Sequence, residues 1–204
     1  MFWSFGKSKS DQSSYGFTIL ELLVVISIFL VITGVVIADI PSFRNKSSLD
    51  LITSEVATYV RGAQVYGATQ RGSGNGDDNV SYGVNFNLNN GSTFFLFKNS
   101  SEGAHEETYD IQGFKVTKIT VYQTSGQTPV NNELDIIFRA NDYTSSIGTQ
   151  LEPEIKMDGD LQSGFDQVDI EIRPDRDQSL CKLVRVYGNG QIAPVALDTC
   201  DPLS

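Results

Sequence analysis

The sequence has little positive charge, with 15 Lys and Arg against 25 Asp and Glu in 204 residues and a formal net charge of −10. Proteins that bind nucleic acid through general electrostatics gather Lys and Arg on one face. The local basic spots here are Arg61 and Arg71 on an expected helix, and Lys115 and Lys118 on an expected strand. Such pairs are typical of a solvated surface, so we expect no direct binding of nucleic acid.

Histidine is also scarce, and this limits the chemistry that the chain can perform. His105 is the single histidine and no CxxC pair is present, so we expect no zinc site. No G-x-S-x-G motif supports a Ser-His-Asp triad. The glycine-rich RGSGNGDDN at residues 71–79 lacks the Lys-Ser/Thr pair of a phosphate loop and follows an expected helix, so we interpret it as a connector. We therefore expect no enzyme and no cofactor, with His105 in a solvated polar loop.

Only two cysteines are present, Cys181 and Cys200, and both lie near the C-terminus. In a chain that leaves the cytoplasm, one such pair is typical of a disulfide that closes a short terminal loop. A loop of this size would stabilise the fold by about 3 kcal/mol in the chain-entropy model. Two free buried thiols are the alternative.

Residues 17–38, FTILELLVVISIFLVITGVVIA, form a long apolar run in which Glu21 is the one ionisable residue. As a helix rising about 1.5 Å per residue, the run would cross a hydrocarbon core of about 30 Å. It exceeds the apolar region of about 7 to 15 residues in a cleaved secretory signal, so we expect it to remain as a membrane anchor. Two lysines in the preceding leader, residues 1–16, are balanced by Arg44 and Lys46 beyond the run, so charge alone does not set the orientation.

Glu21 is costly in such a segment. Insertion scales assign about 2.5 to 3.5 kcal/mol to an acidic residue deep in a membrane helix, and such residues are functional by default. The alternative is a favourable interaction of about 0.3 to 1 kcal/mol with the positive end of the helix dipole. The run contains no Lys or Arg. A cationic partner would therefore come from another chain, or from an amine created by cutting the backbone.

The stretch GFTILELLVVI at residues 16–26 closely resembles the prepilin processing motif of type IV pilins and pseudopilins. The resemblance implies that a membrane-embedded prepilin peptidase cuts after Gly16 and that Phe17 is then N-methylated. It also implies that Glu21 is the glutamate found five residues into mature subunits, where it serves assembly. A free α-amine has a pKa of about 8 and is cationic at neutral pH, so the amine of Phe17 would supply the missing counter-charge.

The resemblance also implies a topology and partners. The protein would be a single-pass cytoplasmic membrane protein with its N-terminus inside and its globular domain outside, and it would reach the cell surface or a periplasmic filament after assembly. Its partners would be other pilin or pseudopilin subunits, the prepilin peptidase, an inner-membrane assembly platform and membrane lipid. VRGAQVYGATQ at residues 60–70 and KLVRVYGNGQI at residues 182–192 look most like minor pseudopilins of the type II secretion group.

Helical patterning continues over residues 39–71, with a kink or a local break expected at Pro41. Apolar residues then recur at helical spacing, which predicts that one face of this outer half packs against a sheet. They are Leu49, Ile52, Val56, Tyr59, Val60, Ala63 and Tyr66 or Gly67.

Residues 72–204 are expected to form a β-rich globular domain. Alternating patterns between turn signals predict strands over 82–86, 93–98, 114–122, 134–139, 167–173, 182–187 and 191–195. Gly188-Asn189-Gly190 is a hairpin signal between the last two. The predicted fold is α+β, with a long N-terminal helix, half transmembrane and half amphipathic, packed on a C-terminal antiparallel sheet. The pilin family has the same plan.

A group of aspartates near residue 160 suggests a second kind of site. Asp158 and Asp160, with Asp166 and Asp169 nearby, are weak candidates for calcium, because this hard cation prefers several carboxylate oxygens. They lack the spacing of an EF-hand loop, and a plain solvated loop is the alternative.

Two functions from different classes remain. The first is a structural subunit of a type IV pilus-like or type II secretion pseudopilus filament, with a large individual domain that favours a minor or tip position. The second is a membrane-anchored extracytoplasmic ligand-binding protein or hydrolase that does not assemble. The acidic charge makes a DNA-uptake pseudopilin the weakest choice within the first class.

Overall fold

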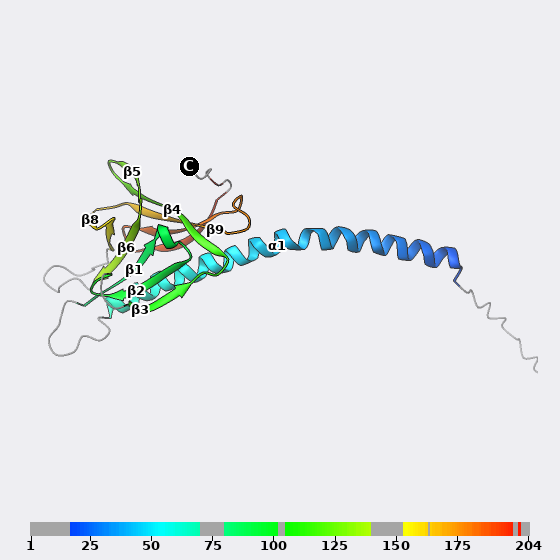
Figure 1. Cartoon of the computed structure of the whole chain (residues 1–204), viewed down its shortest axis with the longest axis horizontal. Coiled ribbons are helices and arrows are strands. Elements are labelled where there is room, and N and C mark those ends of the chain that lie inside the picture. Colours follow the sequence, from blue (N-terminus) through cyan, green and yellow to red (C-terminus); the bar gives the residue numbers. More distant parts are fainter. Residues whose placement is uncertain are drawn as a thin grey trace, which may run out of the picture. The chain divides into compact units, whose positions relative to one another are not determined.

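The computed structural model describes residues 17–69, 80–101, 105–139, 153–162, 164–197 and 200, without the side chains of residues 38–42 (Figure 1). The chain divides into two compact units, Met1–Phe43 and Arg44–Ser204. Within the described residues, one long helix, α1, is followed by eleven strands, with a 3-10 turn between the first two. The expected connector at residues 71–79 lies outside the described residues.

Helix α1 extends over Ile19–Ala68 and is continuous through Pro41. The local break expected at Pro41 was therefore wrong. A proline removes one N–H donor, but the helical turns on either side keep their own hydrogen bonds, and extending an existing helix is much easier than starting one.

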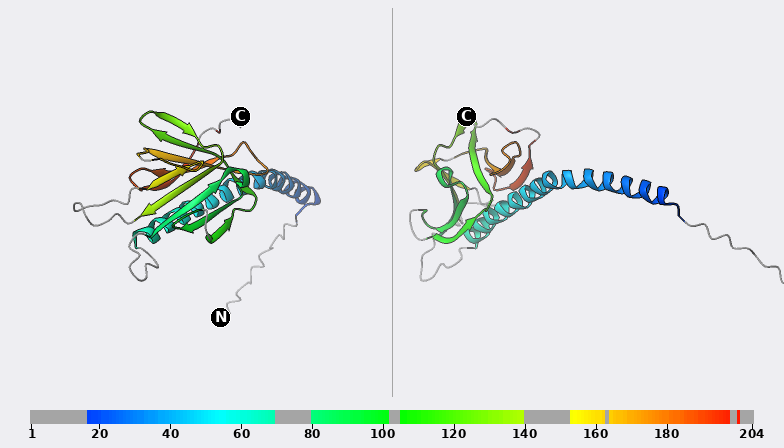
Figure 2. Two further views of the ribbon diagram at one scale, coloured as in Figure 1. Left: turned by 60° about the vertical axis from the view of Figure 1, so that its left-hand side comes forward. Right: turned by 45° about the vertical axis from the view of Figure 1, so that its right-hand side comes forward.

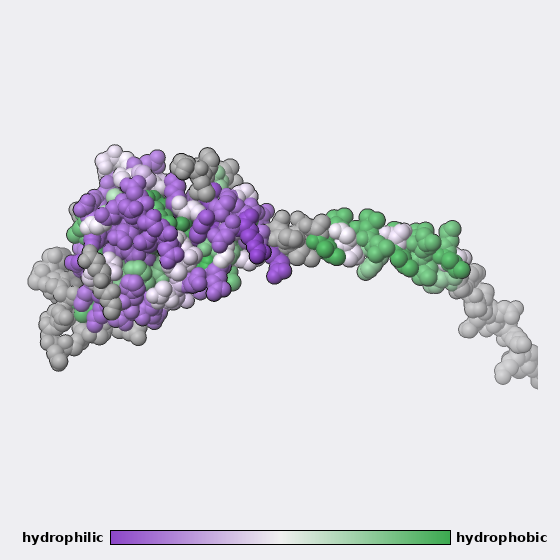
Figure 3. Space-filling model, in the orientation of Figure 1, coloured by the Kyte–Doolittle hydropathy of each residue, from purple (hydrophilic) through white to green (hydrophobic). Residues whose placement is uncertain are grey.

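The first unit presents its apolar side chains outward. Ile19–Ile37, 19 residues with a mean hydropathy of 2.9, is long and apolar enough to cross a membrane, and none of it is buried within the protein. Figure 3 shows hydrophobic residues along this part of α1. The expected apolar membrane-type helix is confirmed.

The second unit contains two antiparallel sheets, so the α+β class is confirmed. The six-stranded sheet A has the order β3-β2-β1-β6-β7-β8, and the five-stranded sheet B has the order β11-β10-β9-β4-β5. Sheet A comprises β1 (Ser81–Asn87), β2 (Thr93–Lys98), β3 (His105–Asp110), β6 (Glu133–Arg139), β7 (Glu154–Met157) and β8 (Asp160–Gln162). Sheet B comprises β4 (Phe114–Gln123), β5 (Gly126–Pro129), β9 (Gln167–Pro174), β10 (Lys182–Tyr187) and β11 (Ile192–Ala196). The 3-10 turn η1 is Leu88–Asn90.

All seven predicted strands are present, whereas β3, β5, β7 and β8 were not predicted. The missed strands are short or polar, and β3, β5 and β8 lie at sheet edges, where side chains need not alternate between core and solvent.

His105 was wrongly placed in a loop. It is the first residue of β3, and its ring stacks on Phe95 with centroids 3.5 Å apart.

One hydrophobic core joins the outer half of α1 to both sheets. Val56, Val60 and Ala63 of α1 are fully buried against residues such as Phe94 of sheet A and Ile170 of sheet B. The predicted β10–β11 hairpin is confirmed, and Val186 pairs with Ile192 in it. Two side chains of α1 also donate hydrogen bonds to this hairpin. Arg61 Nη2 donates to the carbonyl oxygen of Ile192 at 2.7 Å, and Gln64 Nε2 donates to that of Gly190 at 2.9 Å. The predicted packing of this amphipathic half is confirmed, and Figure 2 shows it beside the strands.

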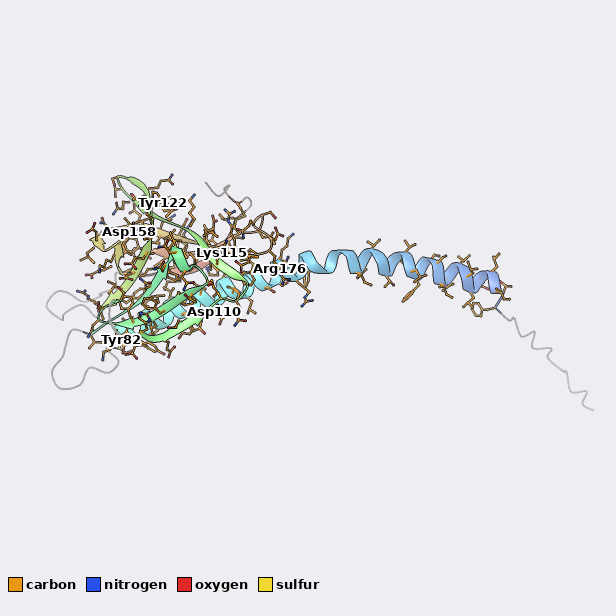
Figure 4. The ribbon with its side chains drawn as sticks, viewed as in Figure 1. Tyr82, Asp110, Lys115, Tyr122, Asp158 and Arg176 are labelled. Carbon is orange, nitrogen blue, oxygen red and sulfur yellow. A yellow bond between two sulfur atoms is a disulfide. The ribbon has the colours of Figure 1, made fainter. Side chains whose placement is uncertain are left out.

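Asp158 forms the turn between β7 and β8 and has a positive φ of 48° (Figure 4). Its carboxylate accepts hydrogen bonds from the backbone N–H groups of Asn131, Asn132 and Glu133 at 3.2, 2.8 and 3.0 Å. Burial raises the pKa of Asp158, but these backbone donors outweigh it and hold the pKa below its ordinary value. The carboxylate thus joins the β7–β8 turn to the segment that leads into β6.

The two cysteines form a disulfide, as predicted. Cys181 and Cys200 have sulfurs 2.04 Å apart and are 19 positions apart in the chain. The bond attaches the chain beyond β11 to the start of β10, and the described part of the chain has no free cysteine.

Gly67 lies at a close approach of α1 to sheet A. A Cβ atom at this position would lie 2.5 Å from the carbonyl oxygen of Phe138, whereas a Cβ at Gly62, one and a half turns earlier, would meet no atom within 4 Å.

We expect Gly67→Ala to destabilise the protein by about 1 to 3 kcal/mol through overpacking. Gly62→Ala, the matched control, should stabilise it by up to about 1 kcal/mol through helix propensity. Thermal unfolding of the full-length protein in detergent, followed by circular dichroism, measures both, and equal shifts would contradict this account.

We expect the double variant Cys181→Ser/Cys200→Ser to unfold at a lower temperature than the native chain, because the open chain gains conformational entropy worth about 3 kcal/mol. The control is reductant, which should lower the unfolding temperature of the native protein and leave that of the double variant unchanged. An unfolding temperature that does not respond to reductant would show that the bond contributes nothing measurable.

Candidate processing and assembly site

The first turn of α1 begins with a side-chain cap. Thr18 Oγ1 accepts a hydrogen bond from the backbone N–H of Glu21 at 3.2 Å, and the Thr18 carbonyl accepts from the N–H of Leu22. Thr-x-x-Glu is the sequence of a capping box, in which the helix start is held by a hydroxyl. Sequence reasoning missed Thr18, although this spacing was the signal.

Glu21 lies in that first turn, where its carboxylate complements the positive end of the helix dipole. Its side chain is exposed, and among the residues that the structure describes no cation pairs with it. Phe17 precedes the helix with 82% of its surface exposed, and Gly16 lies outside the described residues. In the predicted site, Phe17 therefore lies just before the Thr18 cap, and Glu21 lies just after it in the first helical turn.

The apolar surface that follows is not covered by any residue that the structure describes. Large side chains such as Leu20, Phe29 and Val35 are each more than three-fifths exposed. Each Å² of apolar surface left in water forgoes about 25 cal/mol. Burial of this half of α1 in lipid or against other helices would therefore be favourable.

The calcium candidates do not come together. No group of three or more His, Cys, Asp or Glu side chains that could hold a metal ion occurs among the described residues. Asp158 already accepts three backbone hydrogen bonds, and Asp160 is exposed in β8. Asp169 instead pairs with Arg185 on the outer face of sheet B. The described structure offers no support for the calcium site.

The outer face of sheet B carries two ion pairs beside a groove of about 190 Å³. Arg185 donates to both carboxylate oxygens of Asp169 at 2.6 and 2.7 Å, and this bonding raises the pKa of the guanidinium despite partial burial. Arg173 Nε donates to Glu171 Oε1 at 2.6 Å, and Thr117 Oγ1 donates to the same oxygen. These four charged side chains therefore pair with one another on this face.

A second groove, of about 250 Å³, lies between α1 and the edge of sheet A. We call it the tyrosine groove, and its lining includes Tyr59, Gly62, Tyr66, Leu96, Glu107 and Tyr109. Tyr59 and Tyr109 pack with ring centroids 3.6 Å apart. The pKa of Tyr59 is raised, first by burial and then by the negative charges of Glu55 and Glu107. The groove is therefore apolar inside and acidic at its rim, and nothing in the sequence pattern pointed to it.

Comparison with known proteins identifies one family model. Residues 12–37 match the model described as the prokaryotic N-terminal methylation motif. No curated protein matches the chain, and no solved structure matches it. The matched residues include Gly16, Phe17 and Glu21 and lie wholly within the first unit. The match supports a type IV pilin-like protein that a prepilin peptidase processes, with pilin-type subunits as its general partners.

Proposed function

We propose that this protein is a structural subunit of a type IV pilus-like or type II secretion-like filament, and that it is not an enzyme. The observation that carries the proposal is the coincidence of two features in one segment. The methylation motif at residues 12–37 overlaps the exposed apolar helix Ile19–Ile37, and the one carboxylate of that helix lies in its capped first turn.

Cleavage after Gly16 would convert the start of α1 into an assembly contact. The new α-amine of Phe17 is cationic at neutral pH, because such amines have a pKa of about 8. In a neighbouring subunit it would neutralise Glu21, whose charge is otherwise costly in an apolar environment. A buried ion pair seldom adds net stability but can specify register. Head-to-tail contacts between subunits would then extend into an open helical filament.

The apolar half of α1 would hold the subunit in the cytoplasmic membrane, with its leader inside and the sheet unit outside, until an inner-membrane assembly platform transfers it to the filament. The large individual sheet unit favours a minor or tip subunit. The segments at residues 60–70 and 182–192 favour the type II secretion group.

Mass spectrometry of the isolated protein tests the processing step. In cells that contain a prepilin peptidase, we expect the mature chain to begin at N-methylated Phe17. The same chain expressed without the peptidase is the control and should retain Met1. An intact leader in peptidase-containing cells would refute the proposal and favour a membrane-anchored receptor or hydrolase.

Substitution at Glu21 tests the assembly step. We expect Glu21→Ala to be processed normally but to enter sheared filaments roughly tenfold less, equivalent to about 1.4 kcal/mol. Glu21→Gln should fall similarly, because it keeps the size and loses the charge, and Glu21→Asp should retain part of the incorporation. Immunoblots of the membrane and filament fractions measure the ratio. Native incorporation of Glu21→Ala would show that the carboxylate has no role in assembly.

A further inference from the structure

The tyrosine groove has open space beside Gly62. This residue lines the groove, and a Cβ atom there would meet no other atom within 4 Å. The walls are aromatic and aliphatic, with Tyr59 packed on Phe94 and Tyr109, and with Leu96 nearly buried. A cleft of about 250 Å³ lined in this way suits one large apolar side chain.

Two carboxylates lie at the rim of this apolar cleft. Tyr59 Oη donates to Glu55 Oε1 at 3.4 Å, and Glu107 lines the groove from β3 with its side chain exposed. An apolar cleft with a negative rim is complementary to a large apolar side chain that has a cation beside it.

The chain presents such a pair on its own surface. Phe43 is 71% exposed, the highest value among the exposed large apolar side chains that the structure describes beyond Ile37. Arg44 follows it directly, and Lys46 is also exposed. Arg44 and Gly62 belong to the same unit and are separated along α1 by roughly 27 Å at about 1.5 Å per residue. Arg44 therefore cannot reach the groove of its own chain.

We propose that the tyrosine groove receives Phe43 and Arg44 from a second copy of this chain, with Phe43 over Gly62 and Arg44 at Glu55 and Glu107. The inference rests on the proposed filament function and assigns one of its contacts. Donor and groove are different surfaces, so the contact is heterologous and repeats from copy to copy without closing into a dimer. It places at least two copies next to each other, so of the two positions proposed above it favours a minor subunit present in more than one copy over a single tip copy.

A photo-crosslinker at Phe43 tests the contact and keeps an aromatic ring in place. We expect Phe43→p-benzoylphenylalanine in assembled filaments to crosslink to the groove residues of a second copy, identified by mass spectrometry of the joined peptides. The same probe at Leu51, which is equally exposed on α1, should not label the groove. Crosslinks from Phe43 to lipid, to another subunit type or to another surface of the chain would overturn the inference.

Charge reversal gives an independent test with a matched control. Glu107 lines the groove, whereas Glu106, its exposed neighbour on β3, does not. We expect Glu107→Lys to reduce incorporation into filaments about tenfold, Glu106→Lys to leave it unchanged, and Arg44→Glu/Glu107→Lys to recover at least threefold. Equal effects of the two single changes, or no recovery in the double variant, would overturn the inference. If the native chain is processed and assembles while these tests fail, only this contact is wrong, whereas an intact leader would remove the proposed function as well.

Discussion

The packing of one helix face against two sheets is the constraint on which the second unit depends. Val56, Val60 and Ala63 are fully buried, and their neighbours in the core come from both sheets. Hydrogen bonds from Arg61 and Gln64 to the β10–β11 hairpin add direction to this contact, because apolar burial by itself is non-directional. The helix therefore serves as the element around which the two sheets are organised.

The first half of the same helix has the opposite property. Its apolar side chains find no cover within the described chain, and Glu21 finds no cation there. In the proposed filament, neighbouring helices would bury the apolar surface and a processed N-terminus would supply a positive charge. A membrane would cover the apolar surface before assembly, so one segment would act first as an anchor and then as part of a filament core.

Polar groups of the second unit are used for structure. Asp169 with Arg185 and Glu171 with Arg173 satisfy each other on the outer face of sheet B, and Asp158 binds backbone donors at a turn. The tyrosine groove differs, because its acidic rim and apolar interior are matched by an aromatic and basic pair elsewhere on the chain.

The sequence by itself determined the features that arise from local patterns. These are the membrane-type run with its processing motif, the amphipathic face of the outer helix, seven strands, the Gly188–Gly190 hairpin and the disulfide. Each depends on residues close together in the chain, or on a pair with no competing partner.

Only the tertiary structure decided the four polar or edge strands, the order of strands in two sheets, the stacking of His105 on Phe95, and the close approach of Gly67 to Phe138. These depend on backbone ladders and contacts between segments far apart in sequence, which leave no periodic signal in either partner. Pro41 was expected to kink or locally break the helix, and the helix continues through it, because the turns on both sides keep their own hydrogen bonds.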